Sequence, residues 1–134
     1  MQHDEFIGQV QHRARLASRG AAEVAVRAVL ETLAERITTD EANNAAAQLP
    51  KGIGDHLRSN IVASGLRFGL DEFYQLVADR ADLDIQDAVF QSRVVIEVLG
   101  EALSVGEMDD ILAQLPAEYA PLFVGSQGNI AASS

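Results

Sequence analysis

The chain has 134 residues, and its 20 acidic against 10 basic side chains give a formal net charge of −10 at pH 7. This length suits one domain, and a strongly negative chain repels nucleic-acid phosphates and anionic lipid headgroups, so we expect neither a nucleic-acid nor a membrane partner. The absence of cysteine excludes disulfides, thiolate metal sites and cysteine nucleophiles.

Composition and hydropathy also limit which cellular compartment and which fold class we expect. Met1 to Glu5 is polar and acidic, unlike a signal peptide, and no run of about 18 apolar residues occurs, so we expect a cytoplasmic protein. Aromatic residues make up only 5% of the chain. Small aliphatic side chains must therefore fill the core, which favours closely packed helices.

Two helices are predicted first along the chain. Phe6, Val10 and Ala14 lie at helical spacing and predict a helix over about residues 4–16, whose acidic start suits the positive end of the helix dipole. A regular apolar series then predicts a second, longer helix over about residues 21–37.

A capping box marks the third predicted helix. In this motif the hydroxyl of Thr38 accepts from the backbone N–H three residues on, and the carboxylate of Glu41 reaches back to the start. The helix is expected to begin near residue 39 and to end before Pro50, which can open a short fourth helix. Residues 59–70 are too apolar for a free linker, so we expect an ordered crossover there.

The same four elements return in the second part of the chain. Eighteen residues recur 66 or 67 positions on: for example, Asp4-Glu5-Phe6 returns as Asp71-Glu72-Phe73, and Ala47-Gln48-Leu49-Pro50 as Ala113-Gln114-Leu115-Pro116. Ser104 and Glu107 repeat the capping-box spacing. We therefore predict an all-α fold, in which residues 1–124 form a single orthogonal helical bundle built from two tandem four-helix repeats. Repeat one spans 4–58, the crossover 59–70 and repeat two 71–124, and residues 125–134 are expected to be a flexible tail.

The recurring Asp-Glu-Phe opening, capping box and Ala-Gln-Leu-Pro ending together resemble a bacterial family known as domain of unknown function 2267. The resemblance covers residue 4 to about residue 123. It implies a compact, all-helical cytoplasmic domain, and it brings no activity, cofactor or catalytic residue. The crossover is shorter and less rich in proline than in the family's pattern.

No residue pattern indicates catalysis, a cofactor or a metal ion. His3, His12 and His56 lack a second ligand at metal-binding spacing, and the Gly-x-Gly at residues 52–54 follows a predicted helix rather than the strand that a phosphate loop needs. The carboxylates from Asp82 onward do not match a calcium loop. We therefore expect no enzyme activity, catalytic residue, cofactor or metal.

One unrepeated feature suggests an interaction surface. Phe90, Val94 and Val98 form an apolar stripe beside the core face of their helix, where repeat one has weaker residues. The first repeat and the crossover could cover this stripe, or it could bind a protein partner or a second copy in a homodimer. The uneven charge leaves a similar choice: residues 67–134 hold twelve acids and three bases, so −9, which either maintains solubility or offers an acidic face to a basic partner.

The leading functional hypothesis is thus a non-catalytic interaction or adaptor module that uses Phe90, Val94 and Val98. The alternative is a bundle that binds a small apolar ligand between the two repeats. It would need a pocket of roughly 300 Å³ or more. We expect such a pocket to be lined by Leu30, Leu33, Val95 and Leu99.

Overall fold

A computed structural model describes residues 1–59 and 65–124 of the chain, and this part of the protein is all-α, with no strand in either range. The predicted flexible tail at 125–134 and residues 60–64 of the crossover lie outside the described residues. The elements in chain order are α1 (His3–Arg13), α2 (Arg19–Arg36), α3 (Thr39–Ala47), α4 (Lys51–Arg58), α5 (Leu70–Ala81), α6 (Ile85–Ala102), α7 (Val105–Ala113) and the 3-10 helix η2 (Ala117–Phe123). No helix within these two ranges is both long enough and apolar enough to cross a membrane.

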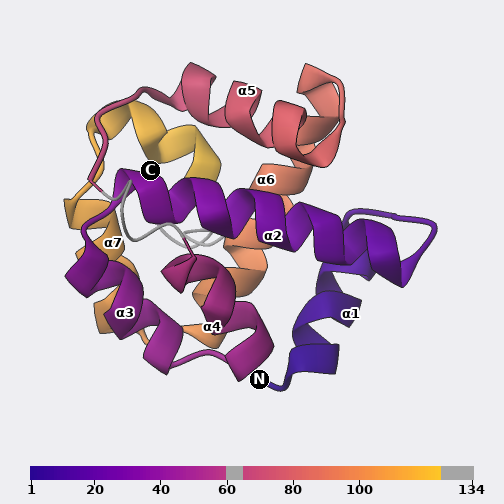
Figure 1. Ribbon diagram of the computed structural model, residues 1–134, viewed down its shortest axis with the longest axis horizontal. Helices are drawn as coiled ribbons and strands as arrows, with labels where there is room; N and C mark the ends of the chain where they lie inside the picture. The colour runs from indigo at the N-terminus through magenta and orange to yellow at the C-terminus, as the bar shows by residue number, and fades with distance from the viewer. Residues whose placement is uncertain (60–64, 125–134) are drawn as a thin grey trace.

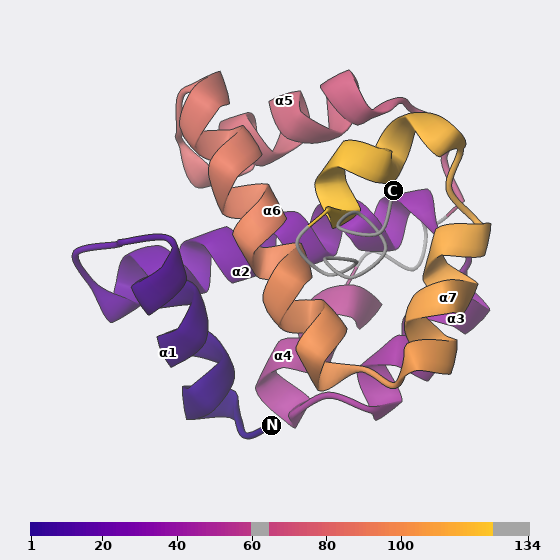
Figure 2. The ribbon, with the colours of Figure 1, turned by 180° about the vertical axis from the view of Figure 1, so that it is seen from behind.

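The two long helices organise the bundle. Helices α2 and α6 contact each other, and α6 crosses α2 steeply in both views (Figures 1 and 2). Helix α5 packs on one side of this pair and α1 near one end of α2, while α3, α4 and α7 lie toward the other side (Figure 1). The orthogonal bundle expected from the sequence is therefore the architecture of the protein.

The core contains the apolar residues that lie at helical spacing in the sequence. Phe6 and Phe73 are both fully buried, and so are Leu33 and Leu99, their counterparts on the two long helices. We call α1–α4 the first half and α5–η2 the second half. Their elements match in length: α1 has 11 residues and α5 12, α2 and α6 have 18 each, and α3 and α7 have 9 each.

The first helix of each half is also paired with the long helix of the other half. Arg13 of α1 contacts Glu97 and Glu101 of α6, at 2.6 Å in each case. Arg80 of α5 contacts Glu35 of α2 at 2.7 Å. Because Arg80 is the repeat of Arg13 and Glu101 the repeat of Glu35, the recurrence of these charges has a structural reason.

The starts of α3 and α7 differ from the predicted capping box. The hydroxyls of Thr38 and Ser104 accept from the backbone N–H three residues on, as expected. The backbone N–H of Thr38, however, donates to the side-chain amide oxygen of Gln114 at 2.9 Å, and that of Ser104 donates to Gln48 at 2.8 Å. An amide from the opposite half therefore takes the place that the motif gives to Glu41 and Glu107. These reciprocal contacts agree with the tandem-repeat interpretation, which remains an interpretation of the sequence.

Candidate functional site

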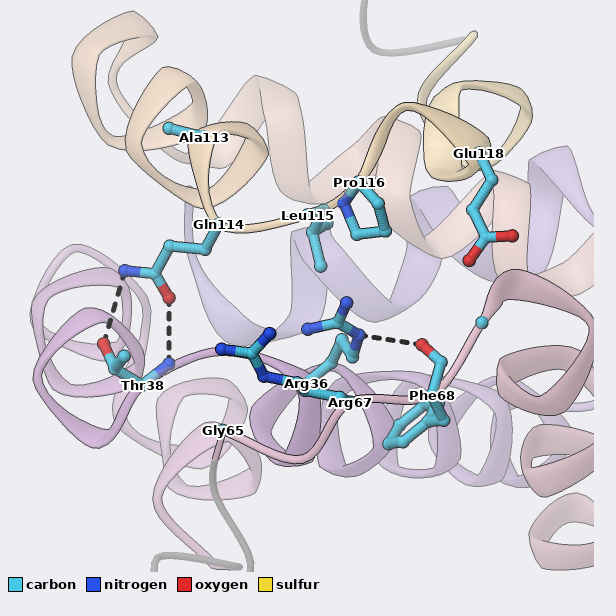
Figure 3. A pocket seen from close by; sticks show the side chains of 11 residues that line it. Arg36, Thr38, Gly65, Arg67, Phe68, Ala113, Gln114, Leu115, Pro116 and Glu118 are labelled. Carbon is cyan, nitrogen blue, oxygen red and sulfur yellow. Dashed lines mark hydrogen bonds between the residues drawn. The ribbon is translucent and has the colours of Figure 1, made fainter.

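A pocket of about 700 Å³ lies where the two halves meet beyond the end of α2 (Figure 3). Its walls are the C-terminal end of α2, residues 65–69 of the crossover, and the turn that leads from α7 into η2. We call it the junction pocket. It is lined by residues from both halves, so its shape depends on how the halves pack.

The crossover wall is held in place by the free carbonyls at the end of α2. The backbone N–H of Gly65 donates to the carbonyl of Ile37 at 2.9 Å, and that of Leu66 donates to the carbonyl of Glu35 at 2.8 Å. Gly65 has a φ of +76°, a conformation that glycine adopts without steric cost. These bonds complete the end of the helix and fix the position of the residues that follow.

Arg36 is anchored at the inner side of the pocket. Its Nε donates to the carbonyl of Phe68 at 2.8 Å, and its guanidinium lies 5.4 Å from the centre of the Tyr119 ring, a cation–π distance. The Tyr119 hydroxyl donates to the same carbonyl at 2.7 Å. Burial raises the pKa of Tyr119 to about 12, so this hydroxyl stays protonated and keeps donating. The arginine therefore has a defined orientation, with only one of its nitrogens used by these contacts.

Arg67 brings a second guanidinium to the same pocket from the exposed crossover wall. Both groups point into the space below Leu115 and Pro116, with Thr38 and Gln114 to one side of them and Glu118 to the other (Figure 3). Within residues 1–59 and 65–124, neither guanidinium has a carboxylate at ion-pair distance. Two unpaired guanidinium groups beside an apolar wall can bind carboxylate or phosphate oxygens, because their planar N–H donors match two acceptor oxygens at once.

Neither arginine stands out in the sequence. The position equivalent to Arg36 in the second half is Ala102, and Arg67 lies in the crossover, so neither belongs to the repeated set. The sequence offers one indication of their importance, namely that basic residues are scarce in a chain of net charge −10. This scarcity cannot identify particular arginines, because it does not tell which of them lack an acidic partner in the folded protein.

The three residues predicted to bind a partner have different environments. Phe90 is 47% exposed, whereas Val94 is 7% exposed and Val98 is fully buried in the core. Helix α1 packs against α6, where Arg13 pairs with Glu97, and both valines belong to the buried core. The predicted stripe is therefore not continuous on the surface, and only Phe90 offers substantial area to a partner. A second pocket of about 660 Å³ is lined by Phe90 and Val94 together with residues of α1 and the turn after it.

The residues predicted to line an apolar ligand pocket belong to the core. Leu30, Leu33, Val95 and Leu99 are all fully buried, and none of them lines the junction pocket or the pocket beside Phe90. The pocket between the halves is instead formed at the end of α2. Its lining mixes charged, amide and apolar groups.

Comparison with known proteins gives a family for the chain. A search of curated proteins found no match. A family model described as "Uncharacterized conserved protein (DUF2267)" matches residues 3–122, nearly the whole chain. The match agrees with the resemblance carried by the recurring Asp-Glu-Phe, capping-box and Ala-Gln-Leu-Pro motifs, and the chain belongs to the DUF2267 family.

Proposed function

We propose that this protein is a non-catalytic interaction module that binds a short acidic segment of a partner protein in the junction pocket. The observation that carries the proposal is the pair Arg36 and Arg67. Both guanidinium groups line one pocket, and within the described residues neither has a carboxylate partner. A partner's Asp or Glu side chains would supply the missing charge.

The shared location of these two arginines makes the pair informative. Within the described residues, three of the nine arginines form ion pairs, namely Arg13, Arg19 and Arg80, whereas Arg36 and Arg67 are unpaired and line one pocket together. A guanidinium that is held in place but unpaired has lost conformational freedom before any ligand binds, so the cost of ordering it on binding is small. Arg36 fits this description because its Nε bond and the Tyr119 ring hold it.

The pocket also accounts for the non-catalytic part of the proposal. Its hydroxyl and amide groups are engaged in holding the fold, since Thr38 and Gln114 cap α3 between them. The apolar groups of Leu115 and Pro116 would contact the neighbouring residues of a bound segment. The net charge of −10 repels a long acidic tail, so the segment is short, with one or two acids beside an apolar residue.

A peptide array would test this function. Fluorescently labelled protein is applied to octapeptides that vary independently in acidic, basic and apolar content. We expect the bound peptides to be acidic with an apolar neighbour, and binding to fall roughly tenfold or more in Arg67→Gln and Arg36→Gln. Arg15→Gln is the matched control, because Arg15 is an exposed arginine outside the junction pocket. Selection of basic peptides, or equal losses in all three variants, would refute the proposal.

A second copy of the chain is the other candidate partner, and Phe90 is the observation that favours it. Of the seven aromatic residues, six are at most 8% exposed and Phe90 is 47% exposed. Exposed aromatic rings are enriched at protein interfaces, where they bury a large area at low entropic cost. Asp87, one helical turn before Phe90, and Arg15 beside the neighbouring pocket would be complementary charges between two copies.

Sedimentation over a range of concentrations tests the second candidate. If copies associate through Phe90, the mass rises with concentration in the wild type, and Phe90→Ser stays at the mass of one chain. Val105→Ser is the control, because Val105 is 79% exposed and lies on a different helix. A wild-type chain that stays monomeric at millimolar concentration excludes self-association and leaves the acidic-segment proposal unaffected.

A further inference from the structure

The contact between α3 and α7 brings two buried carboxylates together. Glu41 of α3 is 8% exposed and Glu107 of α7 is 6% exposed, and one oxygen of each is buried without a hydrogen-bond partner. Asp110, one turn further along α7, is exposed. One carboxylate oxygen from each residue lies within 4.8 Å of the others. We call these three residues the carboxylate cluster.

The glutamates are free to face each other because other groups perform the capping. Gln114 accepts from the backbone N–H of Thr38, and Gln48 accepts from that of Ser104. A carboxylate in a capping box would have used its oxygens for those N–H groups. The Gln114 amide donates to one of the two carboxylate oxygens of Glu41, at 3.2 Å, and the other oxygen is the one without a partner.

Such an arrangement lacks positive charge. Burying a carboxylate costs free energy unless donors or cations compensate it, and a second carboxylate beside it adds repulsion. Burial first, and then Glu41 and Asp110, raise the pKa of Glu107 to about 7. The described residues supply no arginine, lysine or histidine in ion-pair contact with these three acids.

We propose that Glu41, Glu107 and Asp110 form a binding site for a hard divalent cation, with Mg²⁺ or Mn²⁺ as the class that fits. The donor set consists only of carboxylate oxygens, which these ions prefer over nitrogen or sulfur ligands. Three protein oxygens leave room for waters, and the exposed side of Asp110 gives the ion a path from solvent. The bound ion would join α3 of the first half to α7 of the second half.

This site is separate from the arginines of the proposed function, and the two can fail independently. The cation would fill the place of the missing donors of Glu41 and Glu107, so its main effect is to hold the halves together. It requires no partner protein. Failure of the cation to bind would leave the proposal for acidic segments standing, because none of the three carboxylates lines the junction pocket.

Binding of Mn²⁺ to the chelator-treated full chain at pH 7.5, followed by electron paramagnetic resonance, tests the site directly. We expect one Mn²⁺ per chain, displaced by excess Mg²⁺, and a rise in melting temperature of about 5–10 °C at a hundredfold excess over Kd. Asp110→Asn should weaken binding roughly tenfold or more, because it removes a ligand charge. Asp109→Asn is the control: it is an exposed acid next in sequence and outside the cluster.

The exposed position of Asp110 keeps the test decisive, since its substitution is expected to leave the packing of the buried Glu41 and Glu107 side chains unchanged. Glu107→Gln provides a second variant of nearly the same shape, whose amide can donate to Glu41. It should abolish Mn²⁺ binding while the circular dichroism of the helices is retained. The proposal is overturned if Mn²⁺ does not bind at millimolar concentration, or if Asp109→Asn loses as much affinity as Asp110→Asn. If acidification alone stabilises the protein and neither cation has an effect, Glu41 and Glu107 share a proton instead of binding a cation.

Discussion

Arg15 and Asp82, 67 positions apart, share a backbone conformation that no other non-glycine residue in the described ranges adopts. Their φ angles are +57° and +55°. In each case the next residue, Leu16 or Leu83, donates its backbone N–H to the carbonyl five residues earlier, a bond that closes the ends of α1 and α5. The first helix thus ends at Arg13 rather than near residue 16, because the left-handed residue stops it.

Arg15→Gly is expected to stabilise the protein. A side chain with a Cβ pays a steric cost in the left-handed region that glycine avoids, and we expect the free energy of unfolding to rise by about 1 kcal/mol. Asp82→Gly should gain less, since aspartate tolerates this region better than arginine does. Urea unfolding of both variants measures the difference. A loss of stability in Arg15→Gly would show that the arginine makes contacts worth more than its strain.

The reciprocal glutamine caps predict a second pair of effects. Gln48→Ala removes the acceptor for the backbone N–H of Ser104 and should lower the free energy of unfolding by about 1 kcal/mol. Gln114→Ala should cost more, because Gln114 also donates to Glu41, whose carboxylate is buried. Thermal or urea unfolding would compare the two. Equal costs would mean that the bond to Glu41 contributes nothing to stability.

The two inter-half arginines should also differ. Arg80 contacts both Thr32 and Glu35, and the Glu35 side chain is only 10% exposed. Arg80→Met leaves that carboxylate without its cation and is expected to cost about 3 kcal/mol. The partners of Arg13 are more exposed, so Arg13→Met should cost about 1 kcal/mol or less. If Arg80→Met lowers the free energy of unfolding by less than Arg13→Met does, burial of the carboxylate does not determine how much each ion pair contributes to stability.

These pairs show what the sequence could and could not predict. The recurrence of Glu35 at Glu101 showed that the two repeats keep the same residue spacing, and helical periodicity predicted where the helices lie. Both inferences need only the order of residues along the chain. The partner of each charge depends on how the halves pack. The same limit explains the capping box: the spacing of Thr38 and Glu41 predicted the hydroxyl contact correctly, but a glutamine far along the chain supplies the other cap.

Phe90 and Val98 were predicted to act alike, and periodicity alone could not separate them. The exposure of Phe90 and the complete burial of Val98 predict opposite results. Phe90→Ser should change the free energy of unfolding by less than about 1 kcal/mol, and Val98→Asp should abolish cooperative unfolding, because it buries a charge without a partner. Circular dichroism with thermal unfolding checks both. A folded Val98→Asp variant would mean that the core around α6 accommodates a charge at little cost.

The carboxylate cluster predicts how stability depends on pH in the presence of a chelator. The pKa of Glu107 is about 7 in the folded protein, against an ordinary value of 4.5, because of burial and the neighbouring Glu41 and Asp110. A carboxyl group whose pKa is raised by folding binds more protons in the folded state, so its contribution to stability is full below about pH 4.5 and is lost as the pH rises to 7.

The measurement is the midpoint of urea unfolding at several pH values between 5 and 8. His56 acts in the opposite direction, since burial lowers its pKa and folding then disfavours its charged form, so the wild-type curve combines both effects. Glu107→Gln isolates the carboxyl contribution: relative to the wild type, this variant should become progressively more stable as the pH rises from 5 to 7. A constant difference between the two proteins over that range would mean that Glu107 titrates normally. Burial and the nearby Glu41 would then have no effect on the protonation of Glu107.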